Sequence, residues 1–82
     1  MKQYVATFFS HFGAIRFQHL CVERGWQAQL APVPRSLSSS CGTCVLFSTE
    51  ELGELGALVT PELEQLAVSE AEGYRFLFTA EE

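Results

Sequence analysis

Apolar residues in the first part of the chain follow two different spacings. The segment 4–10 (YVATFFS) is rich in β-branched and aromatic residues and has the length of a strand. The segment 11–25 (HFGAIRFQHLCVERG) instead repeats apolar residues three and four positions apart, which is the period of a helix. In the segment 26–33 (WQAQLAPV), apolar and polar residues alternate, as in a strand with one buried face. These spacings predict a strand, a helix and a second strand.

The second part of the chain continues with shorter elements. The run CVLFS (44–48) predicts a third strand. Ser48 and Glu51 have the spacing of a capping box and precede leucines at helical spacing, at Leu52, Leu55 and Leu58. This pattern predicts a second helix, and Pro61 could begin a further short helical segment, because proline is favoured at the first helical position. The run GYRFLFT (73–79) predicts the last strand.

The resulting order, β-α-β-β-α-β, predicts the fold class α+β. We expect a single domain, residues 1–82, with a ferredoxin-like architecture: one four-stranded antiparallel sheet with helices on one face. If the strand order is 4-1-3-2, the first strand ends where the first helix begins and where the loop between strands 2 and 3 lies. Ser10 and His11 should then lie near Cys41 and Cys44, although they are far apart in the sequence.

The charge balance narrows the class of partner. Ten acidic and five basic residues give a net charge of -5, whereas nucleic-acid-binding proteins normally present a basic surface. The chain shows no apolar run of the length that a transmembrane helix needs, and its N-terminus is typical of a strand and not of a signal peptide. We therefore expect a cytoplasmic protein that binds neither nucleic acid nor membrane. In a reducing compartment, its three cysteines are not expected to form a structural disulfide.

The candidate chemistry lies in the loop RSLSSSCGTC, residues 35–44. A thiolate is the reactive form of cysteine, and its pKa falls near cations and in Cys-x-x-Cys pairs. The loop contains such a pair, Cys41 and Cys44, which we predict to carry the chemistry. Its other polar groups could stabilise an anion, and the start of the first helix could add a hydroxyl and a proton donor. The predicted binding residues are therefore Arg35, Ser38, Ser39, Ser40, Gly42, Ser10 and His11.

Other kinds of site fit the sequence less well. A structural zinc site needs four ligands, and His11, Cys41 and Cys44 supply three, so no metal site is predicted. Soft-metal binding and thiol–disulfide exchange by the same two cysteines stay open, as does a non-catalytic interaction module in which the cysteines are incidental. Cys21 lies on the apolar stripe of the predicted helix, where a buried thiol is expected.

The first two thirds of the chain resemble a known family. The pattern TF-x-S, followed by A-x-x-x-x-x-L and then by P-x-P-R-x-L-S-S-S-C-G, is similar to that of the selenium/sulfur carrier-like proteins. The matching residues are Thr7, Phe8, Ser10, Ala14, Leu20, Pro32, Pro34, Arg35, Leu37, Ser38, Ser39, Ser40, Cys41 and Gly42. The chain departs from the family in three ways: the common histidine one position beyond His11 is missing, Gln18 stands where an acid is common, and Cys44 is often absent from relatives.

The resemblance implies a carrier or relay protein more than a turnover enzyme. Cys41 would accept sulfur as a persulfide, or selenium in an equivalent form, with no separate cofactor. Cys44 could then resolve the adduct as a disulfide. The implied partners are a donor protein and an acceptor protein for sulfur or selenium.

Both alternating faces of the predicted strands are apolar. One set of side chains must face the helices, and the other set then leaves an exposed apolar patch. The two sets alternate as Tyr4, Ala6 and Phe8 against Val5 and Phe9, Val45 and Phe47 against Leu46, and Tyr74, Phe76 and Phe78 against Leu77. The segment after Val59 could cover this patch only in part, because it is acidic. A second copy could bury the patch about a two-fold axis, so we expect a homodimer.

Overall fold

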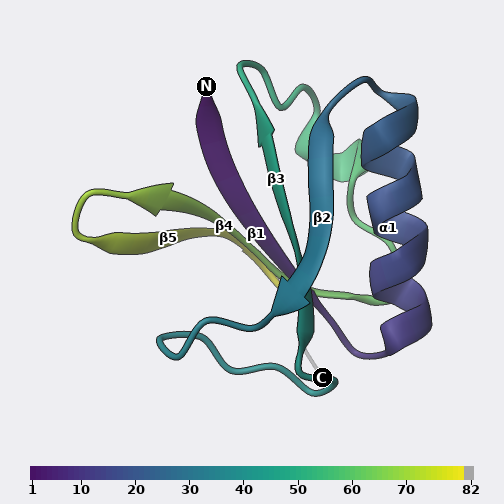
Figure 1. Ribbon diagram of the computed structural model, residues 1–82, viewed down its shortest axis with the longest axis vertical. Helices are drawn as coiled ribbons and strands as arrows, with labels where there is room; N and C mark the ends of the chain where they lie inside the picture. Colours follow the sequence, from purple (N-terminus) through teal and green to yellow (C-terminus); the bar gives the residue numbers. More distant parts are fainter. Residues whose placement is uncertain (81–82) are drawn as a thin grey trace.

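The computed structural model describes residues 1–80, in which one antiparallel sheet carries a helix on one face (Figure 1). The elements are β1 (Lys2–Phe8), α1 (His11–Glu23), β2 (Gln27–Pro32), β3 (Thr43–Thr49), the short 3₁₀ turn η1 (Leu55–Ala57), β4 (Leu63–Glu70) and β5 (Gly73–Thr79). The strand order across the sheet is β2-β3-β1-β4-β5. Within the described residues, no helix is both long and apolar enough to cross a membrane.

The expectation of a ferredoxin-like fold is wrong. The sheet has five strands and not four, and the described residues contain one α-helix and not two. The neighbours β2, β3 and β1 follow the predicted order. On its other side, however, β1 pairs with β4, a strand that the sequence pattern did not predict. The strand predicted to lie there is β5, which pairs with β4 at the edge of the sheet.

The additional strand β4 satisfies the free edge of β1. Without it, the backbone N–H and C=O groups on that side of β1, a strand whose residues 4–8 are all buried, would lack partners. β4 also adds apolar surface, because Leu63, Leu66 and Val68 are almost fully buried. The helical restart expected at Pro61 is therefore wrong.

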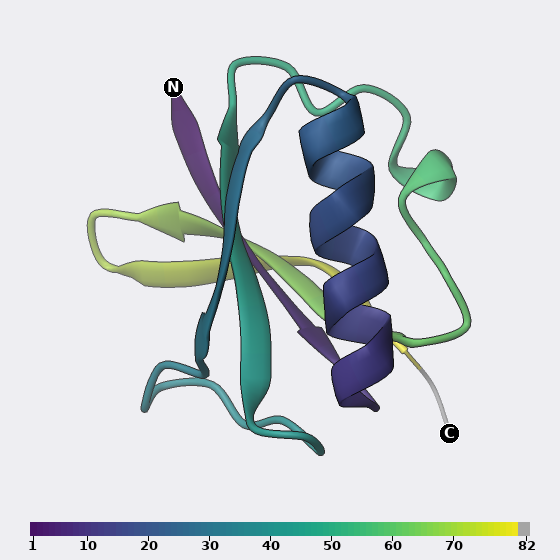
Figure 2. The ribbon, with the colours of Figure 1, turned by 45° about the vertical axis from the view of Figure 1, so that its right-hand side comes forward.

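The second helix expected from the leucine spacing is also wrong. Leu55–Ala57 form a single 3₁₀ turn. Gly53 has a φ of 79°, outside the right-handed helical region, and a glycine within a helix costs about 1 kcal/mol relative to alanine. The spacing nevertheless identified residues that pack: Leu58 is fully buried, and Leu52 and Leu55 contact the core. This irregular segment lies beside α1, where the second helix was expected (Figure 2).

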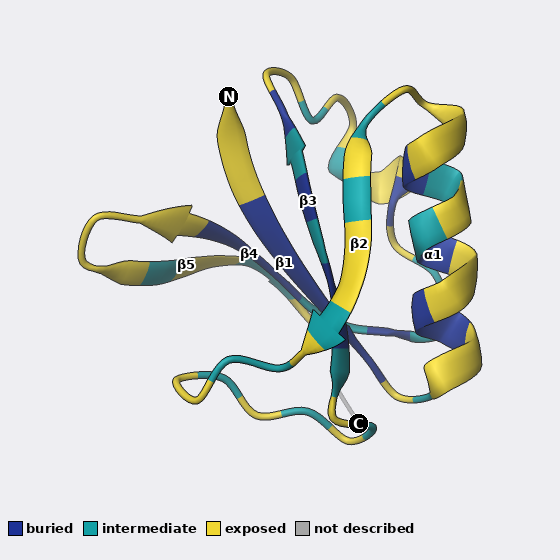
Figure 3. Cartoon of the chain, in the orientation of Figure 1, coloured by how far each residue is buried: buried dark blue, intermediate teal, exposed yellow. Residues whose placement is uncertain are grey.

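The core lies between α1 and the sheet, and the buried residues of α1 face that side (Figure 3). Phe47 of β3 is its centre. The Phe47 ring stacks on the rings of Tyr4 and Trp26, with centroid distances of 5.2 Å and 5.6 Å. Phe17 of α1 approaches the same ring edge-on at 5.5 Å. Aromatic packing therefore joins α1 to β1, β3 and the start of β2.

We expect Gly13→Ala to destabilise the protein, although alanine is the better helix former. Gly13 is buried in the first turn of α1, and a Cβ added there would collide with the Cβ of Glu62, which is close to the backbone and cannot move freely. Overpacking typically costs about 1–3 kcal/mol. The gain from replacing glycine by alanine in a helix is about 1 kcal/mol, so the net change should be a loss of stability. Urea denaturation measures the change in the free energy of unfolding.

The matched control for this prediction is Gly56→Ala. An added Cβ at Gly56 meets no atom within 4 Å, and its φ is not positive. This variant should be neutral or slightly stabilising. If Gly13→Ala proves as stable as Gly56→Ala, the close approach of α1 and Glu62 is wrong.

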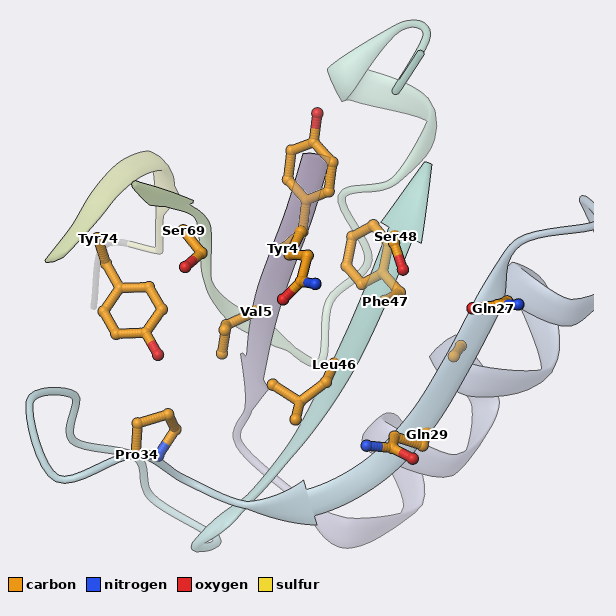
Figure 4. A pocket seen from close by; sticks show the side chains of 12 residues that line it. Tyr4, Val5, Gln27, Gln29, Pro34, Leu46, Phe47, Ser48, Ser69 and Tyr74 are labelled. Atoms are coloured by element: carbon orange, nitrogen blue, oxygen red, sulfur yellow. The ribbon is translucent and has the colours of Figure 1, made fainter. Parts of the chain in front are cut away.

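The sheet face opposite α1 is a shallow trough of about 550 Å³ (Figure 4). Val5 and Leu46 form its floor, with Tyr74 on one side and Gln27 and Gln29 on the other. Val5 is only 3% exposed. Most of the lining is polar. Its amides and hydroxyls come from Gln3, Gln27, Gln29, Tyr4, Ser48, Ser69 and Tyr74. This face is therefore more polar than the alternating apolar pattern of the strands suggested, and it can face water.

Candidate functional site

The serine-rich loop joins β2 to β3 and lies at the end of the sheet where α1 begins (Figure 1). Two backbone hydrogen bonds shape it. Val33 N donates to Gly42 O across the base of the loop at 3.2 Å, and Leu37 N donates to Pro34 O at 3.0 Å to close a turn. Gly42 has a φ of 75°, which places the glycine where a side chain would be strained. The loop is thus closed at its base just before β3.

Two serines of the loop donate hydrogen bonds to other elements. Ser39 Oγ donates to the carbonyl of Phe8 in β1 at 3.3 Å. Ser40 donates twice to the carboxylate of Glu64 in β4, from its backbone N at 3.2 Å and from its Oγ at 2.9 Å. These bonds fasten the residues immediately before Cys41 to the sheet.

The residue that precedes β4 also fastens α1. Glu62 accepts a 2.6 Å hydrogen bond from the hydroxyl of Ser10. Ser10 Oγ in turn accepts from Gly13 N, so the residue caps the helix. Next along β4, Gln65 Oε1 accepts from Thr7 Oγ1 at 3.2 Å. Ser10 therefore acts at the helix cap, and the two glutamates hold the helix start and the loop in place.

Cys41 and His11 meet at Thr43, which begins β3. The Cys41 thiol donates to the carbonyl of Thr43, with an Sγ–O distance of 3.4 Å. The Nδ1 atom of His11 lies 3.2 Å from the Thr43 hydroxyl. His11 is exposed and Cys41 is half-buried, resting against the apolar core. The structure thus brings His11 to the cysteine loop, as the topology argument predicted, through one shared threonine.

Cys44 lies in a different environment from Cys41. Cys44 is fully buried, and its thiol donates to the carbonyl of Pro32 at an Sγ–O distance of 3.6 Å. Burial, and to a smaller extent the negative charge of Cys41, raise the pKa of the Cys44 thiol above its ordinary value. Since strand residues alternate between faces, Cys44 points away from the core side on which Val45 packs. The thiolate of Cys44 is therefore scarce at neutral pH.

Cys21 is buried on α1, as its place on the apolar stripe predicted. Burial raises the pKa of its thiol to about 12, although the charge of Arg24 acts in the opposite direction. All three thiols are free. Of the three, Cys41 is the one that solvent and a reactant can reach.

We expect native alkylation at neutral pH to modify Cys41 well before the other two cysteines. The reason is access: Cys41 is half-buried, whereas Cys21 and Cys44 are fully buried and have raised pKa values. Peptide mass spectrometry after timed iodoacetamide treatment measures the three rates. Denatured protein, in which all three should react alike, is the control. Equal labelling of Cys21 and Cys41 in the native protein would contradict the assignment.

The remaining predicted site residues lie on the loop surface. Arg35 and Ser38 are exposed, and Arg35 belongs to the turn closed by Pro34 and Leu37. Within residues 1–80, no three His, Cys, Asp or Glu side chains gather as a metal ion would require. Soft-metal binding by the two cysteines alone needs no third ligand of this kind and stays a prediction.

The sequence pattern missed Glu62 and Glu64. Both lie in the acidic segment after Val59, in which Pro61 was expected to begin a short helical segment. The available signal was the alternation Glu62, Glu64 around Leu63, which places both carboxylates on one face of a strand.

We expect Glu64→Ala to loosen the loop and to speed alkylation of Cys41 by about threefold to tenfold. The variant removes both acceptors of Ser40, and a lost hydrogen bond to a charged group, discounted for its exposure, corresponds to about 1 kcal/mol. Glu64→Gln, which keeps one acceptor oxygen, should lie between wild type and Glu64→Ala. Glu72→Ala, an exposed change in the β4–β5 turn, is the control. An unchanged rate in Glu64→Ala would show that these hydrogen bonds do not restrain the loop.

Comparison with known proteins agrees with the sequence pattern. A family described as "Putative Se/S carrier protein-like" matches residues 3–68. The chain belongs to this family. The Se/S carrier-like match extends well beyond the serine-rich loop and includes Glu62 and Glu64, whereas β5 lies outside it. The comparisons found no matching curated protein and no matching solved structure.

Proposed function

We propose that the protein carries sulfur, or selenium in the equivalent oxidation state, as a covalent adduct of Cys41. The observation that carries the proposal is the difference among the thiols: Cys41 is accessible at the end of a fastened loop, whereas Cys21 and Cys44 are buried. Membership of a Se/S carrier-like family supports the same class of function. The protein is in this view a carrier and not a turnover enzyme, and it needs no separate cofactor.

The loading step is an exchange at sulfur. The Cys41 thiolate attacks the terminal sulfur of a donor persulfide, the S–S bond of the donor breaks, and the donor leaves as a thiolate. Cys41 then holds the persulfide, and an acceptor thiolate removes the sulfur by the same exchange. No net oxidation occurs, since the transferred sulfur keeps its oxidation state. A donor and an acceptor protein are therefore the partners.

His11 and the serines support this step in different ways. His11 is exposed and contacts the hydroxyl of Thr43, the same residue whose carbonyl accepts the hydrogen bond of Cys41. It can therefore supply or accept a proton at the mouth of the site. Ser39 and Ser40 donate to Phe8 and Glu64 in the free protein, and so hold the loop that carries Cys41. Arg35 and Ser38 remain exposed in the same loop for an anionic adduct or donor.

A two-cysteine mechanism has less support. Cys44 is buried, the pKa of its thiol is raised, and the thiol donates a hydrogen bond to the carbonyl of Pro32. A Cys41–Cys44 disulfide would require Cys44 to leave this position. Non-reducing peptide mapping after mild oxidation tests the alternative: an intramolecular Cys41–Cys44 bond would favour the relay or redox function, and its absence would leave Cys41 as a single-cysteine carrier.

Mass spectrometry after exposure to a low-molecular-weight persulfide tests the proposed function. The protein should gain the mass of one sulfur atom on the peptide that contains Cys41, and a reductant should remove it. Loss of two thiols without added mass would favour thiol–disulfide exchange, and neither change would favour a non-catalytic module.

The homodimer also remains a prediction. Its original reason was an apolar open face, and that face is lined largely by amides and hydroxyls. Phe76 of β5, which is 48% exposed, is a large apolar side chain that pairing at this edge could cover. Light scattering at micromolar concentration decides between a mass near 9.1 kDa and twice that mass.

A further inference from the structure

Thr43 contacts the Cys41 thiol and the His11 ring through two different groups. Its backbone carbonyl accepts the hydrogen bond of the thiol at an Sγ–O distance of 3.4 Å, and its hydroxyl lies 3.2 Å from Nδ1 of His11. Thr43 is the first residue of β3, where it pairs with Pro32 of β2. The sheet therefore fixes the residue at which the loop thiol and the helix imidazole meet.

The His11 side chain lies on the exposed surface at the start of α1. The cap formed by Ser10 fixes the backbone there, but an exposed side chain can still rotate among several rotamers. The Thr43 hydroxyl is the polar group that the His11 ring contacts. This contact favours one orientation of the ring, with Nδ1 toward Thr43 and Nε2 as the nitrogen that can exchange a proton with a reactant.

Two carboxylates at the same end of the sheet have other roles. Glu62 accepts the hydrogen bond of the Ser10 hydroxyl, and Glu64 accepts both hydrogen bonds of Ser40. They hold the helix start and the loop in place. His11 is the imidazole that the structure links to Cys41, and imidazole is the side chain best suited to gain and lose a proton at neutral pH.

We propose that Thr43 is a positioning residue, whose hydroxyl orients the His11 ring so that His11 takes the proton of Cys41 and passes it to the donor. This role rests on the function proposed above. The proton leaves Cys41 Sγ for Nε2 of His11 as Sγ bonds to the terminal sulfur of the donor persulfide. The S–S bond of the donor breaks, and the imidazolium gives the proton to the departing donor thiolate. The exchange consumes no proton and no electron.

The role of Thr43 requires one tautomer of the neutral His11 ring. To accept a proton at Nε2, the ring must carry its hydrogen on Nδ1, from which it donates to the Thr43 hydroxyl. The hydrogen bond made by one ring nitrogen commonly determines which of the two is protonated. Removal of the hydroxyl should therefore lower the population of the Nδ1–H tautomer.

Threonine is also a good strand former, and two substitutions at position 43 separate the hydroxyl from that structural role. Thr43→Val removes the hydroxyl, keeps the backbone carbonyl that Cys41 contacts, and suits a strand at least as well. Thr43→Ser keeps the hydroxyl and removes the methyl group. Both variants should fold, because Thr43 is only half-buried, and urea denaturation checks this.

The first measurement is the rate at which a low-molecular-weight persulfide loads Cys41 in the full chain. Thr43→Val should slow loading by about threefold to tenfold, as expected for the loss of one neutral hydrogen bond. Thr43→Ser should load at close to the wild-type rate. A wild-type rate in Thr43→Val, or equal slowing by Thr43→Ser, would overturn the proposal.

Thr49→Val is the matched control from the opposite end of β3. The Thr49 hydroxyl also makes hydrogen bonds, both of them with the backbone of Glu51. The same substitution there removes a bonded hydroxyl from the same strand and should leave the loading rate unchanged. Equal slowing by Thr49→Val and Thr43→Val would show a general effect on β3 and would overturn the specific role of Thr43.

The double variant His11→Ala/Thr43→Val shows whether Thr43 acts through His11. His11→Ala alone should slow loading at least as much as Thr43→Val alone. Addition of Thr43→Val to His11→Ala should cause no further slowing, because the ring that the hydroxyl orients is already absent. A further loss of rate in the double variant would show that Thr43 acts independently of His11.

Two readouts without sulfur transfer separate this proposal from the carrier function. Nitrogen NMR of the His11 ring should show less Nδ1–H tautomer in Thr43→Val and not in Thr43→Ser, with the exposed His19 as internal control. Alkylation of Cys41 by iodoacetamide also requires loss of the thiol proton, so Thr43→Val should slow it as well. If the wild type does not load but both readouts respond, the carrier function is wrong and the role of Thr43 stands. If the wild type loads and neither readout responds, the carrier function stands and the role of Thr43 is wrong.

Discussion

Cys41→Ser should abolish persulfide loading, whereas Cys44→Ser should retain most of it. A serine hydroxyl at position 41 cannot form the persulfide, so no added mass should survive on the loop peptide. Cys44 is fully buried with a raised pKa, so its thiolate contributes little to the first exchange. Serine at position 44 can still donate to the carbonyl of Pro32 and changes the volume little. Mass spectrometry after treatment with a small persulfide measures the loading of each variant.

Cys21→Ser serves as a third arm of the same experiment. The Cys21 thiol is buried on α1 and should carry no adduct in the wild type, so Cys21→Ser should load Cys41 as the wild type does. Adduct mass on Cys41→Ser would show that another thiol carries the sulfur. A complete loss of loading in Cys44→Ser would instead show that both cysteines of the pair take part, and it would restore the two-cysteine mechanism.

Leu58→Ala should reduce the free energy of unfolding by about 2–5 kcal/mol, the usual cost of truncating a fully buried leucine. Leu58 is 0% exposed and belongs to the core cluster, although it follows a single 3₁₀ turn and not a helix. Since small domains are stable by only about 5–15 kcal/mol, this loss would remove a large share of the stability. Urea denaturation monitored through Trp26 fluorescence measures it.

Leu52→Ala is the matched control from the same segment. Leu52 is half-buried at the edge of the core, so its truncation should cost clearly less than that of Leu58. Equal costs for the two variants would mean that the irregular segment does not cover the core as the structure shows.

Local spacing was sufficient for the elements from β1 to β3. The helix predicted over residues 11–25 occupies His11–Glu23, and the last strand predicted over 73–79 occupies Gly73–Thr79. The first strand ends at Phe8, earlier than the run 4–10 suggested, because Ser10 leaves the strand to cap α1. These elements have regular apolar periods and clear ends, and their neighbours in space do not alter them.

The segment between β3 and β5 could not be assigned from local spacing. Leucines three residues apart indicate a helix, but the intervening glycines permit the turn that the structure adopts. In β4, the apolar residues Leu63, Leu66 and Val68 follow neither a pure strand period nor a pure helical one, and the pairing with β5 shifts register between Leu66 and Ala67. The free edge of β1 decides the outcome, because it supplies hydrogen-bond partners that a helix at this position would leave unmatched.

The sequence by itself indicated the family and led to the hypothesis that the loop cysteine Cys41 carries the chemistry, because both depend on residue types at short spacing. It also indicated that His11 would reach this loop, since the connection from β1 to α1 and the loop from β2 to β3 meet at one end of the sheet. Only the tertiary structure decided that Glu64 fastens Ser40, that Glu62 fastens the helix cap, that Cys44 is buried, and that apolar side chains remain exposed along α1. The two glutamates contact serines 52 and 24 positions away, and no local period of the chain encodes a contact that depends on which strand pairs with β1.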